Sequence, residues 1–117
     1  MNKVFKWNGA EFKFSALDAN MMEKFDPITQ KAAEELDKYE KEHGSDGTID
    51  AEGVRAECEI IDKMFDLILG EGAAKRMFYD LDLYERVAAF NKLTKMKEMQ
   101  IKRYEALITS ITNTKEE

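Results

Sequence analysis

The chain has 117 residues, of which 44% are hydrophobic, 36% charged and 10% aromatic, and its formal net charge is −6. This apolar and aromatic content excludes a disordered chain, and the acidity argues against a nucleic-acid partner. A single cysteine and a single histidine exclude an internal disulfide and a zinc site built from such ligands. No apolar run approaches the ~18 residues of a membrane-spanning helix, and the polar N-terminus does not resemble a secretory signal, so we expect one cytosolic domain over residues 1–117.

Residues 1–14 predict a β-hairpin with strands at about 3–7 and 10–14. Asn8 and Gly9 favour a type I′ turn, because both central residues of that turn need a positive φ. The resulting register pairs Lys6 with Glu11 and gathers the apolar side chains on one face, namely Phe5, Trp7, Ala10, Phe12 and Phe14. An isolated hairpin is marginal in water, so this face packs on the chain's own helices, pairs with a partner or leaves the hairpin mobile.

Two helices are predicted between residues 16 and 43. Ser15 or Asp18 can cap a short helix near 16–25, and Asp26 before Pro27 favours a new start, with a longer helix near 27–43. One kinked helix is the alternative. Apolar residues at steps of three and four predict the buried face: Met22, Phe25, Ile28, Ala32, Leu36 and Tyr39.

After a loop at 44–48, Asp50 can cap a helix that runs to about Leu69, where Gly70 is a natural stop. The spacing predicts that this helix buries Val54, Cys58, Ile61, Phe65 and Ile68, with Ile60, Met64 and Leu67 widening the apolar face. A short helix is expected at 73–78.

The last helix is expected from about Leu83 to Thr112, capped by Asp80 or Asp82, with residues 113–117 as a flexible tail. Its N-terminal part places Val87, Phe90 and Leu93 in the core. Thirty helical residues span ~45 Å, whereas a compact chain of about this size has a radius of gyration of only ~13 Å. The far end therefore projects or is covered by a partner chain, unless it folds back on its own domain.

The apolar residues at that far end predict an interface. Together with the hairpin aromatics, the candidate interface residues are Tyr104, Leu107, Ile108, Ile111, Phe5, Trp7 and Phe12. The fold class that these elements predict is mostly α: a bundle of about four helices over residues 16–112 with a small N-terminal β-hairpin.

Charge is distributed unevenly along the chain. Residues 15–70 carry six basic and fifteen acidic residues, whereas between residues 86 and 103 only Glu98 opposes a basic set: Arg86, Lys92, Lys95, Lys97, Lys102 and Arg103. These oppositely charged segments can attract each other within one chain or between chains, or they can simply be solvated helix faces.

The segment 46–50 resembles the centre of a calcium-binding EF-hand loop. With Gly47 at the sixth loop position, however, Gly44 occupies position 3 and Gly53 occupies position 12, where calcium needs side-chain oxygens and a bidentate Glu. We therefore predict an ordinary turn that does not bind calcium.

Other residues offer no catalytic constellation. Cys58 lies on an apolar helix face, where a structural cysteine is expected. His43 stands at a helix end with no Cys or second His to work with, and the carboxylate pairs Glu34/Glu35 and Glu57/Glu59 are expected on charged faces. The prediction is a protein without a cofactor, a metal site or an enzymatic activity.

The stretch from Glu59 to Phe90 resembles the tail assembly chaperones of long-tailed phages and prophages of Gram-positive bacteria. In that family an apolar helix end meets a Gly-x-Gly, as Gly70-Glu71-Gly72 does here; a short Ala-rich turn ending in Phe follows, as with Ala73, Ala74 and Phe78. An aspartate-capped helix then begins, as at Asp82-Leu83. The acidic first half and the chain length are similar too.

This resemblance implies a non-enzymatic factor in the cytoplasm of a bacterial host, without nucleic-acid or membrane partners. Such proteins bind the tape-measure protein and help to recruit tail-tube subunits during tail morphogenesis, and the family often makes a longer product by ribosomal frameshift. The alternative function is a self-associating small structural component of a phage tail or virion, so a homo-oligomer also stays open.

Overall fold

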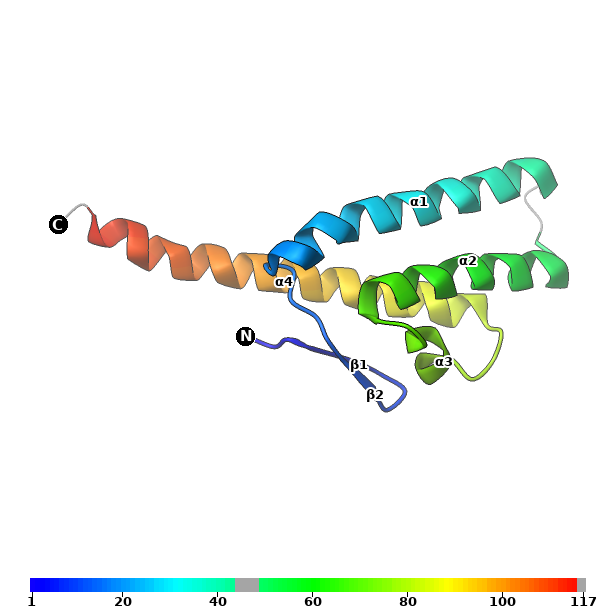
Figure 1. The fold of residues 1–117 in the computed structure, drawn as a ribbon, viewed down its shortest axis with the longest axis horizontal. Helices are drawn as coiled ribbons and strands as arrows, with labels where there is room; N and C mark the ends of the chain where they lie inside the picture. Colours follow the sequence, from blue (N-terminus) through cyan, green and yellow to red (C-terminus); the bar gives the residue numbers. More distant parts are fainter. Residues whose placement is uncertain (44–48, 116–117) are drawn as a thin grey trace.

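A computed structural model describes residues 1–43 and 49–115 (Figure 1). In these residues the chain forms, in order, strands β1 (Val4–Trp7) and β2 (Ala10–Lys13) and helices α1 (Ala19–His43), α2 (Ala51–Leu69), α3 (Ala73–Met77) and α4 (Leu83–Thr114). The mostly helical fold class with an N-terminal hairpin is as predicted.

The hairpin has the predicted turn and register. Asn8 and Gly9 have φ values of 48° and 81°, and Phe5 pairs with Phe12 while Lys6 pairs with Glu11. The apolar face is covered by the chain's own helices, since Phe5, Phe12 and Phe14 are all buried in the common core. This settles that the hairpin packs on its own domain.

Helix α1 is continuous through Pro27, so the prediction of two separate helices is wrong and the single-helix alternative is correct. Asp18 caps its N-terminus by accepting a hydrogen bond from Met21 N at 3.1 Å. Pro27 has no N–H to donate into the helix, and the Thr29 hydroxyl donates to Phe25 O and Asp26 O beside it. The helix buries Met21, and the predicted core residue Met22 is exposed instead.

Helices α2 and α3 start and stop close to the predicted places. The Asp50 side chain accepts a hydrogen bond from Gly53 N at 2.8 Å, and Gly70, with φ 121°, ends α2. Helix α1 packs along α2 (Figure 1). Leu67, predicted to widen the buried face, is exposed. The loop 44–48, with residues 46–48 of the EF-hand-like segment, lies outside the described residues.

Helix α4 begins at the predicted Asp82 cap and ends at Thr114, two residues beyond the predicted end, so Asn113 and Thr114 are helical rather than part of a tail. Its buried face is not the predicted one at the start: Val87 is exposed, whereas Arg86 and Ala89 are buried. A periodicity count treats arginine as polar and therefore misses a helix face that contains a buried, paired guanidinium.

The molecule is elongated. Its principal extents are 62 × 31 × 20 Å and its radius of gyration is 17.3 Å. Figure 1 shows the cause, because the C-terminal end of α4 extends well past the start of α1 and past the hairpin. The expectation that the far end projects is confirmed, and it does not fold back onto its own domain.

Candidate functional site

The projecting end of α4 carries an uncovered apolar surface, which we call the α4 stripe: Tyr104, Leu107, Ile108 and Ile111. Tyr104, Leu107 and Ile111 are 42%, 55% and 67% exposed, and Ile108 is partly exposed. Three large apolar side chains left in water on one helix face make this end of α4 a candidate interaction surface.

The α4 stripe continues the face of α4 that packs on the core. Leu93 and Gln100 are buried seven residues apart, and Leu107 follows at the same spacing. Residues seven apart lie on nearly the same side of an α-helix. The core-facing side of α4 therefore runs on past the last elements that cover it, which is the structural reason for the exposed stripe.

The hairpin members of the predicted interface are not available to a partner. Phe5 and Phe12 are buried in the chain's own core, and only Trp7 is partly exposed. The predicted interface thus divides into two parts: the hairpin aromatics stabilise the domain, and the α4 stripe is the part that is free for binding.

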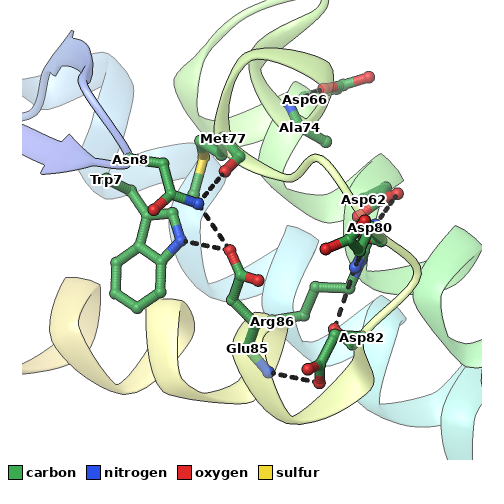
Figure 2. Close-up of polar contacts among 10 residues, drawn as sticks. All are labelled: Trp7, Asn8, Asp62, Asp66, Ala74, Met77, Asp80, Asp82, Glu85 and Arg86. Atoms are coloured by element: carbon green, nitrogen blue, oxygen red, sulfur yellow. Dashed lines mark hydrogen bonds and ion pairs between the residues drawn. The ribbon is translucent and has the colours of Figure 1, made fainter.

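A polar cluster locks the hairpin turn to the start of α4 (Figure 2). Trp7 Nε1 and Asn8 Nδ2 donate to Glu85 Oε1 at 3.0 and 2.7 Å, and Asn8 Nδ2 also donates to Met77 O at 2.8 Å. The Tyr79 hydroxyl donates to Asn8 O. Asn8 therefore adopts the positive φ that the turn requires, and its side chain also links the turn to the α3–α4 region.

Beside this cluster, Arg86 joins α4 to α2. Its guanidinium donates to both carboxylate oxygens of Asp62 at 2.7 and 3.1 Å, and to the carbonyl oxygens of Asp80 and Asp82 (Figure 2). Burial by itself would lower the pKa of Arg86. The hydrogen bond and the charge of Asp62 outweigh burial and raise this pKa above its usual value. Arg86 also lies over the Phe78 ring at 4.5 Å.

The residues on which the resemblance to tail assembly chaperones depends form turns, a helix cap and a buried contact. Gly70 and Gly72 both have positive φ values, 121° and 81°. Ala74 is buried and donates its N–H to Asp66 Oδ1 at 2.8 Å, and Asp82 accepts from Glu85 N at 3.2 Å. This motif turns the chain between α2 and α4.

The remaining titratable groups are arranged for packing. Burial, the largest influence, raises the pKa of the Cys58 thiol, and the charge of Arg86 partly opposes this shift. Glu57 is not on a charged face as predicted, because it is only 5% exposed. Burial raises its pKa, and so do the hydrogen bond that its protonated form donates to Glu40 and the negative charge of Glu40. Glu57, like Arg86, is a charged residue whose burial the sequence did not predict.

A second surface, which we call the hairpin groove, lies between β1 and the middle of α4 and has a volume of about 490 Å³. Its lining includes Met96, Met99 and several basic residues of α4. The sequence indicated the basic segment but not the groove, because nothing local in the sequence places the hairpin beside residues 92–103.

Across the described ranges 1–43 and 49–115, no cluster of three or more potential metal ligands occurs, and none of the helices is long and apolar enough to cross a membrane. The fold and its exposed surfaces thus define a small, mostly helical protein with candidate protein-binding surfaces.

The chain belongs to a family of unknown function, DUF6673, whose model matches residues 8–116. Comparisons with curated proteins and with solved structures give no match.

Proposed function

We propose that this protein is a non-enzymatic assembly factor of the phage tail assembly chaperone type, which binds a tape-measure protein and recruits tail-tube subunits in the cytoplasm of a bacterial host. The observation that carries the proposal is the α4 stripe, an apolar helix face that projects beyond the domain. The resemblance of residues 59–90 to tail assembly chaperones supplies the class of client.

A tape-measure protein is a suitable client for such a surface. Long tape-measure proteins are rich in amphipathic helices, and a projecting helix with apolar residues at steps of three and four can pack against one of them. Burial of each large apolar side chain contributes about 1.5–3 kcal/mol relative to leaving it in water. The four residues of the stripe can therefore support a specific but reversible complex.

The second candidate function is a self-associating structural component of a tail or virion. The same exposed stripe supports it, because two copies of α4 can bury their stripes against each other. The two functions differ in what they require: the chaperone needs a client in the complex, whereas the structural component assembles from purified protein alone.

The test is affinity capture of tagged protein that is co-expressed with the products of neighbouring genes, combined with sizing of the purified chain. In the variant Leu107→Asp with Ile111→Asp, we expect an unchanged circular-dichroism spectrum and at least about tenfold weaker capture of the client. The matched control is Ala106→Asp with Thr109→Asp, which adds the same charge on another side of α4.

Three results would contradict the proposal. We call Leu107→Asp with Ile111→Asp the stripe variant. If this variant still captures the client, the client binds another surface. Unfolding of the stripe variant, but not of the control, would place these residues in the core. Assembly of the purified wild-type chain, abolished by the stripe variant and with no client captured, would favour the structural component.

A further inference from the structure

The hairpin groove has an apolar floor. Val4 and Phe5 of β1 contribute from one side, and Met96 and Met99 of α4 contribute from the other. Met99 is 71% exposed, and methionine side chains adapt their shape to what they contact. A groove of about 490 Å³ is large enough for a few apolar side chains of a partner.

The rim of the groove is basic. Its charged lining residues are all cations: Lys6, Lys92, Lys95 and Arg103. Lys6 lies 3.4 Å from Glu11, and Lys92 donates to the carbonyl oxygen of Lys6. Among the residues that the structure describes, no carboxylate lies within 4.0 Å of the charged end of Lys95 or Arg103.

Two other cations of the basic segment are neutralised within the chain. Arg86 pairs with Asp62, and Lys97 pairs with Asp26 at 3.3 Å. Part of the attraction between the acidic and basic segments is therefore satisfied inside the chain. On the groove side, an acidic protein of net charge −6 keeps a local basic site, which favours a negatively charged partner.

The backbone edge of β1 that is not paired with β2 indicates whether a partner can bind as an added strand. Two groups on this edge already have partners: Val4 N donates to Asn2 Oδ1, and Lys6 O accepts from Lys92. An incoming chain therefore finds part of the backbone edge occupied, so addition of a third strand is disfavoured. Recognition by side chains is favoured instead.

We propose that the hairpin groove binds a short acidic segment of a partner protein. Its apolar side chains pack on Val4, Met96 and Met99, and its carboxylates pair with Lys95 and Arg103. The part of α4 from Lys92 to Arg103 is about 17 Å long, which matches about eleven helical residues. This site is separate from the α4 stripe and adds a second docking surface to the proposed function.

The test uses the full-length protein and a labelled twelve-residue peptide in which Glu and Leu follow the pattern of an amphipathic helix. Binding is measured by fluorescence anisotropy. For Lys95→Glu with Arg103→Glu we expect at least about tenfold weaker binding than for wild type. The control Lys38→Glu with Lys102→Glu makes the same charge change at exposed sites outside the groove, and its affinity should stay within about twofold.

Two further probes test the chemistry of the occupant. A peptide with Lys in place of every Glu should not bind, and a peptide with Gln in place of every Leu should bind at least about tenfold more weakly. Equal binding of these peptides, or no binding of the Glu/Leu peptide at about 1 mM, would overturn the proposal. Tighter binding of single-stranded DNA, or dimerisation of the chain through the groove, would assign the groove to a different occupant.

The stripe variant distinguishes this proposal from the proposed function. Leu107→Asp with Ile111→Asp should leave peptide binding within about twofold while client capture is lost. If peptide binding is lost in that variant and retained in Lys95→Glu with Arg103→Glu, the peptide binds the stripe and the groove proposal is wrong. Client capture that persists beside normal groove binding would instead contradict only the proposed function.

Discussion

Gln100 is the side chain that connects the N-terminal segment to the last helix. It is 2% exposed, and its Oε1 accepts from Ala16 N at 2.7 Å while its Nε2 donates to Asn2 O and Phe14 O at 2.9 and 2.8 Å. A buried amide that meets three backbone groups leaves them unsatisfied when it is replaced. One polar residue therefore specifies how the chain leaves the hairpin.

We expect Gln100→Met to lower the free energy of unfolding by about 2–4 kcal/mol, because a side chain of similar length then removes all three hydrogen bonds. Urea unfolding followed by circular dichroism measures this loss. The control is Gln30→Met on the exposed side of α1, for which we expect a change within about 0.5 kcal/mol. Equal stability of the two variants would show that Gln100 is replaceable.

Gly9 tests a purely conformational requirement. Its φ is +81°, and a Cβ at this position would meet nothing within 4 Å. Gly9→Val should therefore lower the free energy of unfolding by about 1–2 kcal/mol through backbone strain alone, whereas Gly9→Asn should lose clearly less, because asparagine tolerates a positive φ. Thermal unfolding compares the two variants. An unchanged melting temperature for the valine variant would contradict the type I′ turn in solution.

At the scale of elements, the sequence predicted what local rules control. The turn at Asn8-Gly9, the caps Asp50 and Asp82 and the stop at Gly70 each depend on a few neighbouring residues, and all four are confirmed. Local rules were insufficient where a small rotation of a helix about its axis decides which of two neighbouring residues is buried. The neighbours Met21 and Met22 are equally apolar, and only the position of the core decides which one is buried.

Of the two candidate binding surfaces, the sequence predicted one and could not predict the other. Exposure of the α4 stripe followed from helix length and compact size, both of which the sequence contains. The hairpin groove could not be predicted, because it depends on a contact between residues 4–6 and 92–103. Glu57 was misplaced for a related reason: its burial depends on how α1 packs across α2, which spacing along one helix does not report.

The free energy of unfolding should depend on pH, because Glu57 is buried at the contact between α1 and α2. Burial and the neighbouring Glu40 raise the pKa of Glu57 above its ordinary 4.5. A carboxyl whose folded pKa is raised contributes stability fully below its unfolded pKa and loses it as the pH rises through its folded pKa. Ionisation of Glu57 therefore destabilises the pairing of the two helices.

We expect Glu57→Gln to raise the free energy of unfolding at pH 7 by about 0.5–1 kcal/mol, because it removes the buried charge and keeps a hydrogen-bonding group. The gain should shrink as the pH falls, because the folded wild-type carboxyl takes up a proton at a higher pH than it does in the unfolded chain. Urea unfolding across this pH range provides the measurement, with the exposed Glu59→Gln as the control. A gain that is independent of pH would contradict the assignment.

At the scale of the whole molecule, the stable domain and the binding end of α4 are separable. The last side chains of α4 that pack on the core are those of Gln100 and Ile101, and in the described residues after Arg103 none is buried. The core of the chain is thus complete before the α4 stripe begins. Stability and binding can then be changed independently.

A chain that ends after Arg103 should keep its free energy of unfolding within about 1 kcal/mol of the full chain while it loses client capture. A chain that ends after Lys95 lacks Met96 and Gln100 and should lose at least about 3 kcal/mol. Urea unfolding compares the two truncations. Strong destabilisation by the first truncation would mean that the stripe belongs to the core.

The links between the two ends of the sequence also decide the order in which this chain can fold. Asn2 and Gln100 are 98 positions apart, and Trp7 and Glu85 are 78 apart. Such contacts close large loops and form late, whereas the neighbouring helices α1 and α2 can pair early. On a nascent chain, the hairpin turn therefore lacks its partners Met77 and Glu85 until α3 and the start of α4 have been synthesised. Although it is made first, the turn gains its hydrogen bonds to the helices only after α1 and α2 have been made.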